Sequence, residues 1–258
     1  MAESTEVLDS SRPPAPRSIL SRLGLHRAEL RAWAMYDWAN SAFVTIVMAA
    51  VFPVYFGKVA NAGFDSSAIT ARLAAVNALA ILINAVAAPV LGALADRRPI
   101  KKKLLAVFML LGASSTAGMF FITEGRWMLA CGLLLAANVG AAGSFVFYNA
   151  LLPHIATDDE TDRVSAGGFA LGYIGGGLAL LISLAIILKP DLVGIPRGTL
   201  PSRIVFLFTA AWWALFTLPL LLKVPEPAIA PAHGGSKPLN AVRQVFRTLA
   251  ELRTYRGA

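Results

Sequence analysis

The feature that most constrains the fold is a series of six apolar runs, each close to the length that a helix needs to cross a bilayer. A bilayer core about 30 Å thick requires roughly 20 apolar residues in a helix. Only 15% of the 258 residues are charged, whereas a soluble domain carries about 25%. The sequence therefore predicts an all-α membrane protein with helices at residues 33–57, 72–95, 104–122, 127–152, 164–188 and 203–223.

The net charge of +8 is distributed unevenly over the predicted loops. With a cytoplasmic N-terminus, 17 of the 23 Lys and Arg residues lie on cytoplasmic segments and six lie on the opposite side. This asymmetry follows the positive-inside rule, so we expect both termini in the cytoplasm. The same asymmetry explains the net positive charge by the interaction of the chain with the lipid bilayer. A nucleic-acid partner is therefore not expected.

The composition divides the chain into a cytoplasmic tail at residues 1–32, a six-helix bundle at 33–224 and a cytoplasmic linker at 225–258. Residues 1–17 have the composition of a disordered tail, and residues 18–33 either form a short basic amphipathic helix or a plain juxtamembrane anchor. The linker is rich in Pro and Gly and ends in a second basic amphipathic pattern. The single cysteine, Cys131, lies in an apolar run, so we expect no disulfide framework, metal or cofactor.

The first apolar run carries a polar cluster at its start. In "RAWAMYDWANSAFVTIVMAAVFPVYF", Asp37, Asn40 and Ser41 occupy one arc of a helix. The apolar remainder is about 22 Å long, too short to span alone, so the cluster must lie at or just inside the membrane boundary. Asp37 could then carry a proton in step with a substrate. Alternatively, Asp37 and Asn40 cap the first helix at the lipid interface.

Further amides lie on single faces of two other predicted spans. Asn77 and Asn84 are seven residues apart in the second span, and Asn138 and Asn149 are eleven apart in the fourth, where Tyr148 adjoins Asn149. Amides are costly in hydrocarbon unless paired, so we expect these faces to point into the bundle. They either bond helices together or, with the polar cluster of the first span, line a pathway for a solute or proton.

The fifth span carries small residues on one side. These are Gly168, Gly172, Gly175 and Gly176. Such a stripe allows another helix to approach to backbone contact. The stripe therefore predicts helix packing, either as a static interface or as a sliding surface between two halves of a larger bundle.

The loop between the second and third spans contains a recognisable motif. In "GALADRRPIKKK", Gly92, Asp96, Arg97 and the basic cluster resemble the loop signature of the major facilitator superfamily, although Pro99 and Ile100 depart from it. Asp96 can cap a neighbouring helix or pair with an arginine, and Gly92 permits close packing. The resemblance implies a cytoplasmic gating loop.

Two longer stretches, "YDWANSAF" and "FYNALLPHIATDDETDRVSAGGFALGYIGG", resemble the vacuole effluxer branch of that superfamily, which includes fungal autophagy-related vacuolar amino acid exporters and bacterial relatives. The resemblance covers roughly residues 31–227. It implies a twelve-helix transporter that alternates access around a midplane site, of which this chain would be the N-terminal six-helix half. The missing C-terminal half or a second chain would then be its partner.

These observations lead us to expect a secondary active transporter half that moves a small polar solute such as an amino acid, with or without proton coupling. A bacterial inner membrane is the expected location. A non-transporting fragment, or a half-transporter that needs a partner chain, is the alternative. An intramembrane enzyme is disfavoured because Ser144 and His154 would be about 15 Å apart along a helix and no catalytic motif is present, so no catalytic residue is expected.

Overall fold

The computed structural model describes residues 19–227, apart from the side chains of Ala93, Leu94, Asp96 and Arg97. All regular structure in that part of the chain is helical. The predicted tail at residues 1–17 and most of the linker, including its second basic amphipathic pattern, lie outside the described residues.

The six predicted spans are confirmed. Within the described residues, six helices are long and apolar enough to cross a membrane. The first span, Ala28–Ala60, consists of α2 (Ala28–Ala42), η1 (Phe43–Ala50), α3 (Val51–Tyr55) and η2 (Phe56–Ala60). The others are α4 (Ser66–Arg97), α5 (Lys101–Gly118), α6 (Trp127–Leu151), α7 (Asp158–Leu188) and α8 (Leu200–Lys223). Short helices α1 (Ile19–Arg22), η3 (Met119–Phe121), η4 (Leu152–His154) and η5 (Pro190–Val193) lie before or between them.

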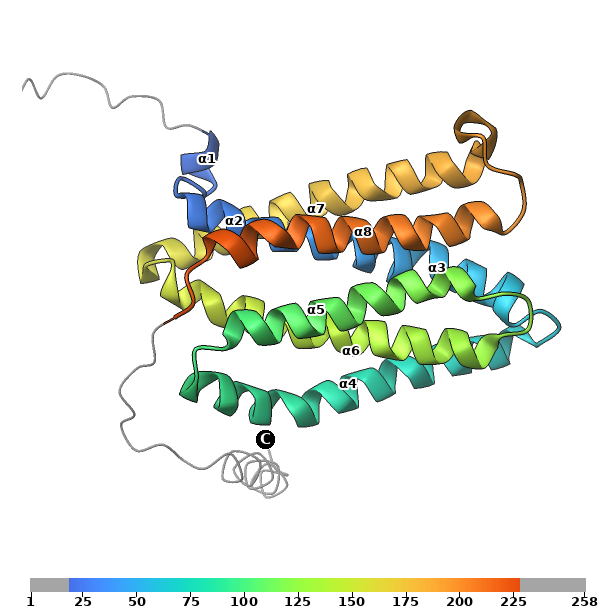
Figure 1. Ribbon diagram of the computed structural model, residues 1–258, viewed down its shortest axis with the longest axis horizontal. Helices are drawn as coiled ribbons and strands as arrows, with labels where there is room; N and C mark the ends of the chain where they lie inside the picture. The colour runs from blue at the N-terminus through green and yellow to red at the C-terminus, as the bar shows by residue number, and fades with distance from the viewer. Residues whose placement is uncertain (1–18, 228–258) are drawn as a thin grey trace, which may run out of the picture.

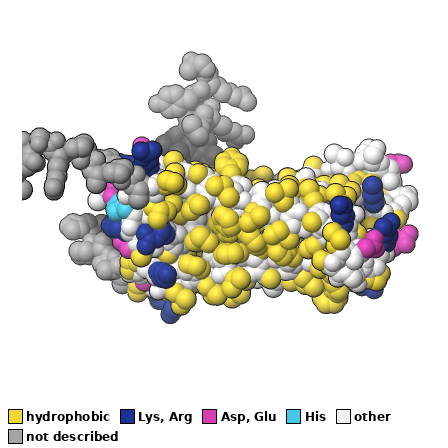
Figure 2. All heavy atoms as spheres, turned by 90° about the horizontal axis from the view of Figure 1, so that it is seen from above, with side chains coloured by type: hydrophobic (Ala, Val, Ile, Leu, Met, Phe, Trp, Pro, Cys, Tyr) yellow, Lys and Arg dark blue, Asp and Glu magenta, His cyan; other side chains and the backbone are white. Residues whose placement is uncertain are grey.

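The long helices run side by side along the length of the molecule (Figure 1). The first span packs against α7 and α8, α5 packs against α6 and α8, and α4 packs against α6. Of the six spans, α4 is the least buried. Figure 2 shows a hydrophobic band between two ends where charged side chains gather, which is the pattern that a bilayer-spanning bundle requires.

The first span departs from α-helical geometry near its middle. Segments η1 and η2 are π-helical, and the Val51 backbone N–H donates to the Ile46 carbonyl five residues earlier. Pro53 lies between the two segments and has no N–H to donate to a preceding carbonyl, while its ring crowds the previous turn. Wide turns of this kind are frequent at functional sites.

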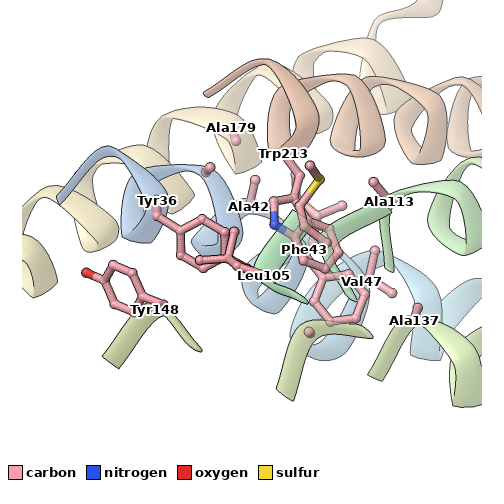
Figure 3. Close-up of a cluster of buried hydrophobic side chains, with 14 of the residues drawn as sticks. Tyr36, Ala42, Phe43, Val47, Leu105, Ala113, Ala137, Tyr148, Ala179 and Trp213 are labelled. Carbon is pink, nitrogen blue, oxygen red and sulfur yellow. The ribbon is translucent and has the colours of Figure 1, made fainter. Parts of the chain in front are cut away.

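Close packing in the core depends on glycines and aromatic rings. Phe43 of η1 stacks on Trp213 of α8 with ring centroids 5.1 Å apart (Figure 3). Where α5 crosses α6, a Cβ placed on Gly140 would lie 2.6 Å from both the Gly112 Cα and the Phe108 carbonyl oxygen. Only glycine therefore allows this crossing without moving backbone.

The segments just before the first span and just after α8 contact the bundle. Both contacts lie at the end of the bundle where α2 begins. Arg27 forms an ion pair with Glu160 at 2.8 Å, which joins the start of α2 to the first turn of α7. After α8, Glu226 accepts hydrogen bonds from the Lys101 and Lys102 backbone N–H groups at 2.6 and 3.0 Å. A carboxylate in this position satisfies unpaired donors at the start of α5 and complements the helix dipole.

Candidate functional site

Asp37 lies well inside the first helix and not at its start. Helix α2 begins at Ala28 after Arg27, so Asp37 is about 14 Å further along. The interpretation of Asp37 and Asn40 as caps of the first helix is therefore wrong. The reason is that residues 28–32, assigned from their polarity to the tail, form the first turns of the span, where Leu30 and Ala32 are buried.

Asp37 is only 5% exposed, and none of the described side chains forms a hydrogen bond or an ion pair with its carboxylate. It borders a cavity of about 510 Å³ between the first span, α6 and α7, which we call the acidic cavity. Its lining consists of Asp37, Asn40, Ser41, Val44, Thr45, Phe145, Phe169, Gly172, Tyr173 and Gly177. Phe169 and Tyr173 of α7 are 60% and 83% exposed, so the cavity is open on the side that these two residues form.

A second cavity of about 350 Å³ lies between the first span, α4 and α6, and we call it the amide cavity. Its polar lining residues are Asn40, Asn77, Asn84 and Asn138. Asn40 borders both cavities, and its amide nitrogen is buried without a hydrogen-bond partner in the described part of the chain. The structure thus brings six of the eight predicted pathway residues to two adjoining cavities.

The amides of the amide cavity also make the bonds that a structural role would require. The Asn138 Nδ2 donates to the Asn77 Oδ1 at 2.8 Å and links α6 to α4. The Asn84 Nδ2 donates to the Ala80 carbonyl within α4 at 2.9 Å. Asn77 and Asn138 therefore combine interhelical bonding with the lining of a cavity, whereas the bond of Asn84 lies within its own helix.

The remaining two predicted pathway residues lie elsewhere. Tyr148 is buried and stacks on Trp33 with centroids 4.2 Å apart, while the Trp33 Nε1 donates to the Tyr148 carbonyl at 3.0 Å. Figure 3 shows Tyr148 beside Tyr36, whose hydroxyl donates to Ser144 at 2.5 Å. Asn149 is exposed and borders neither cavity. Ser144 is fully buried, so it offers no accessible nucleophile in this conformation.

The glycine stripe of α7 faces the first span. A Cβ on Gly172 would lie 2.8 Å from the Ser41 Oγ and 3.0 Å from the Asp37 Cγ. The same addition would meet the Trp33 ring at Gly168, the Trp38 ring at Gly175 and Thr45 at Gly176. The stripe therefore has its packing partner inside this six-helix bundle, and Gly172 places α7 directly against the acidic cavity.

The loop motif that resembles the major facilitator superfamily, at residues 92–103, is only partly described in the structure. Gly92 is half-buried in α4, and a Cβ there would meet no described atom within 4 Å, so close packing within this part of the chain does not require the glycine. Asp96 and Arg97 continue the helix, and their side chains lie outside the described residues.

The aromatic residues that line the acidic cavity and the π-helical turns of the first span were not predicted from the sequence. Phe145, Phe169 and Tyr173 come from two spans and look like ordinary apolar residues, so only the packing reveals them. Pro53 in the middle of an apolar run was the available signal for the wide turns. Within the described residues no group of three or more His, Cys, Asp or Glu side chains could hold a metal ion.

The fold and the two cavities define a multi-pass membrane protein with solute-sized spaces among its helices. The family model described as vacuole effluxer Atg22-like matches residues 25–162 and 156–258. The chain belongs to this family of the major facilitator superfamily.

Similar proteins come from bacteria and fungi. An uncharacterized MFS-type transporter, YxiO of Bacillus subtilis, is 35% identical over 88% of this chain and 53% of its own length. Autophagy-related protein 22 of Pyricularia oryzae is 21% identical over 86% of this chain and 47% of its own length. The chain thus spans about half the length of these curated relatives. No solved structure matches it significantly.

Proposed function

We propose that this chain forms the N-terminal half of a secondary active transporter that moves a small polar solute, with amino acids as the cargo. The observation that carries the proposal is the acidic cavity, in which a buried carboxylate borders a solute-sized space inside a membrane-spanning bundle. Ligand sites commonly have volumes of about 300–1,000 Å³ and mostly apolar walls with few polar groups. The resemblance of the chain to effluxers and an MFS-type transporter supports the same function.

The open side of the acidic cavity supports the proposal of a second half. Phe169 and Tyr173 border the cavity and are largely exposed, so this side is available for another element to cover. We propose that this element is a second six-helix unit, either in the same polypeptide or in a partner chain. Alternating access would then expose the cavity to one side of the membrane at a time, with Asp37 as the group through which protons are coupled.

Two features support a proposal for orientation and location. Basic residues predominate on the segments that we assign to the cytoplasm, so we propose cytoplasmic termini. The short loops and the similarity to a Bacillus subtilis transporter support a bacterial inner membrane.

The test uses the protein encoded by its intact native gene, reconstituted into liposomes. Uptake of each standard amino acid is measured with and without an imposed proton gradient, against liposomes without protein. Saturable uptake of at least one amino acid is expected. Uptake at the background rate for the whole panel, by protein that is correctly inserted, contradicts the proposal and favours a non-transporting role.

A further inference from the structure

The charge of Asp37 requires compensation that the described part of the chain does not supply. Asp37 is 5% exposed, and the ion pairs among the described side chains join other groups, all near the ends of the bundle. An uncompensated carboxylate in a membrane interior is strongly unfavourable. A cation or a proton that enters the cavity is therefore needed to neutralise it.

Ser41 lies beside Asp37 in the lining of the acidic cavity. A single added carbon on Gly172 would contact both the Ser41 Oγ, at 2.8 Å, and the Asp37 Cγ, at 3.0 Å. The carboxylate of Asp37 and the hydroxyl of Ser41 therefore lie close together against α7, and both border the acidic cavity. Both are hydrogen-bond acceptors, and an ammonium group carries three donors that can use them.

Three aromatic side chains also line the acidic cavity. Phe145 comes from α6, and Phe169 and Tyr173 come from α7. Aromatic faces attract organic cations, which favours an ammonium group over an alkali ion. The lining also carries side-chain oxygens on Asp37, Asn40, Ser41, Thr45 and Tyr173, so the test below includes alkali ions. The rings also supply apolar surface for the remainder of a small organic molecule.

We propose that Asp37 and Ser41 bind the protonated amine of the solute and that Asp37 is the residue that makes the site selective for amines. This inference rests on the proposed function, since it assigns one end of the transported molecule to one pair of side chains. A proton and an ammonium group are alternative partners of the same carboxylate. Their exchange at Asp37 would couple the release of one to the binding of the other.

The test measures equilibrium binding to the purified intact protein, without any transport step. Radiolabelled amino acids are bound first, and each one that binds is then challenged with its unlabelled form and its N-acetyl derivative, which has no ammonium charge. We expect the N-acetyl derivative to compete about 10- to 100-fold more weakly, the loss expected for a charge-assisted hydrogen bond. Equal competition, or no binding by any amine in the panel, overturns the inference.

Variants assign the effect to Asp37. Asp37→Asn should weaken binding of the free amino acid by about 10- to 100-fold and remove the preference over the N-acetyl form, and Asp37→Glu should restore part of it. Asp191→Asn is the matched control, because Asp191 pairs with Arg197 on the exposed loop before α8. Melting temperatures in sodium and potassium gluconate test the alkali-ion alternative. A sodium-specific rise that Asp37→Asn abolishes, without amine preference, also overturns the inference.

The two proposals fail in different ways. Saturable flux with equal use of the free and N-acetylated solutes would support the transporter function and contradict the amine site. Selective amine binding without flux would support the amine site and contradict the transporter function.

Discussion

The crossing of α5 and α6 gives the sharpest prediction about stability. In Gly140→Ala, the new methyl group would lie 2.6 Å from the Gly112 Cα and the Phe108 carbonyl oxygen, whereas carbon contacts are normally about 3.5–4.0 Å. Relief requires the two helices to separate by about 1 Å, because the contacted atoms are backbone. Overpacking costs about 1–3 kcal/mol, and three close backbone contacts place this site at the upper end.

Alanine also has a higher helix propensity than glycine, by about 1 kcal/mol. The net expectation for Gly140→Ala is therefore a loss of about 2 kcal/mol in the free energy of unfolding. Gly132→Ala on the same helix is the matched control, since a Cβ there meets no described atom within 4 Å. It should be neutral or stabilising by up to about 1 kcal/mol.

The assay is reversible unfolding of the purified protein in mixed micelles of mild detergent and dodecyl sulfate, followed by circular dichroism. Gly140→Ala should unfold at a lower dodecyl sulfate fraction than wild type, and Gly132→Ala should not. A Gly140→Ala variant as stable as Gly132→Ala would show that the α5–α6 crossing tolerates the methyl group, because the two substitutions differ only in what that group meets.

Three further outcomes follow from contacts of single side chains. A double-mutant cycle of Asn77→Ala and Asn138→Ala should give a coupling of about 0.5–2 kcal/mol, measured by the same unfolding assay, and zero coupling would contradict their interhelical hydrogen bond. Glu226→Ala should accelerate amide hydrogen exchange in the first turn of α5 about fivefold, and unchanged exchange would show that its carboxylate does not cap that helix. Gly172→Ala should lower solute flux about 10- to 100-fold with correct insertion retained, because its methyl group displaces the polar groups of the acidic cavity. Flux at the wild-type rate would contradict the close packing of Gly172 against Ser41 and Asp37.

The membrane architecture could be predicted from sequence because it depends on the lengths of apolar runs, which hardly depend on tertiary contacts. The start of the first span was the main difference. Polar residues before Trp33 suggested a tail, but Leu30 and Ala32 are buried and the helix begins at Ala28. Burial among neighbouring helices, rather than hydrophobicity along the chain, decides that boundary.

The candidate site was only partly predictable. Helical periodicity grouped the amides of α4 correctly, since Asn77 and Asn84 border one cavity. The same reasoning paired Asn138 with Asn149, yet Asn149 is exposed, because an eleven-residue separation does not determine how far a neighbour covers a helix. Which helix the glycine stripe would meet depends on the packing of α7 against the first span, and no local pattern encodes that choice.

The role of Asp37 in the acidic cavity is tested by comparing solute counterflow by wild type, Asp37→Asn and Asp191→Asn in proteoliposomes made from the intact protein. If the acidic cavity is the solute site, wild type and Asp191→Asn exchange a labelled amino acid at similar rates. Asp37→Asn should then be slower by about 10-fold or more at low substrate concentration. Exchange by Asp37→Asn at the wild-type rate and with wild-type affinity would contradict the assignment of this cavity as the solute site.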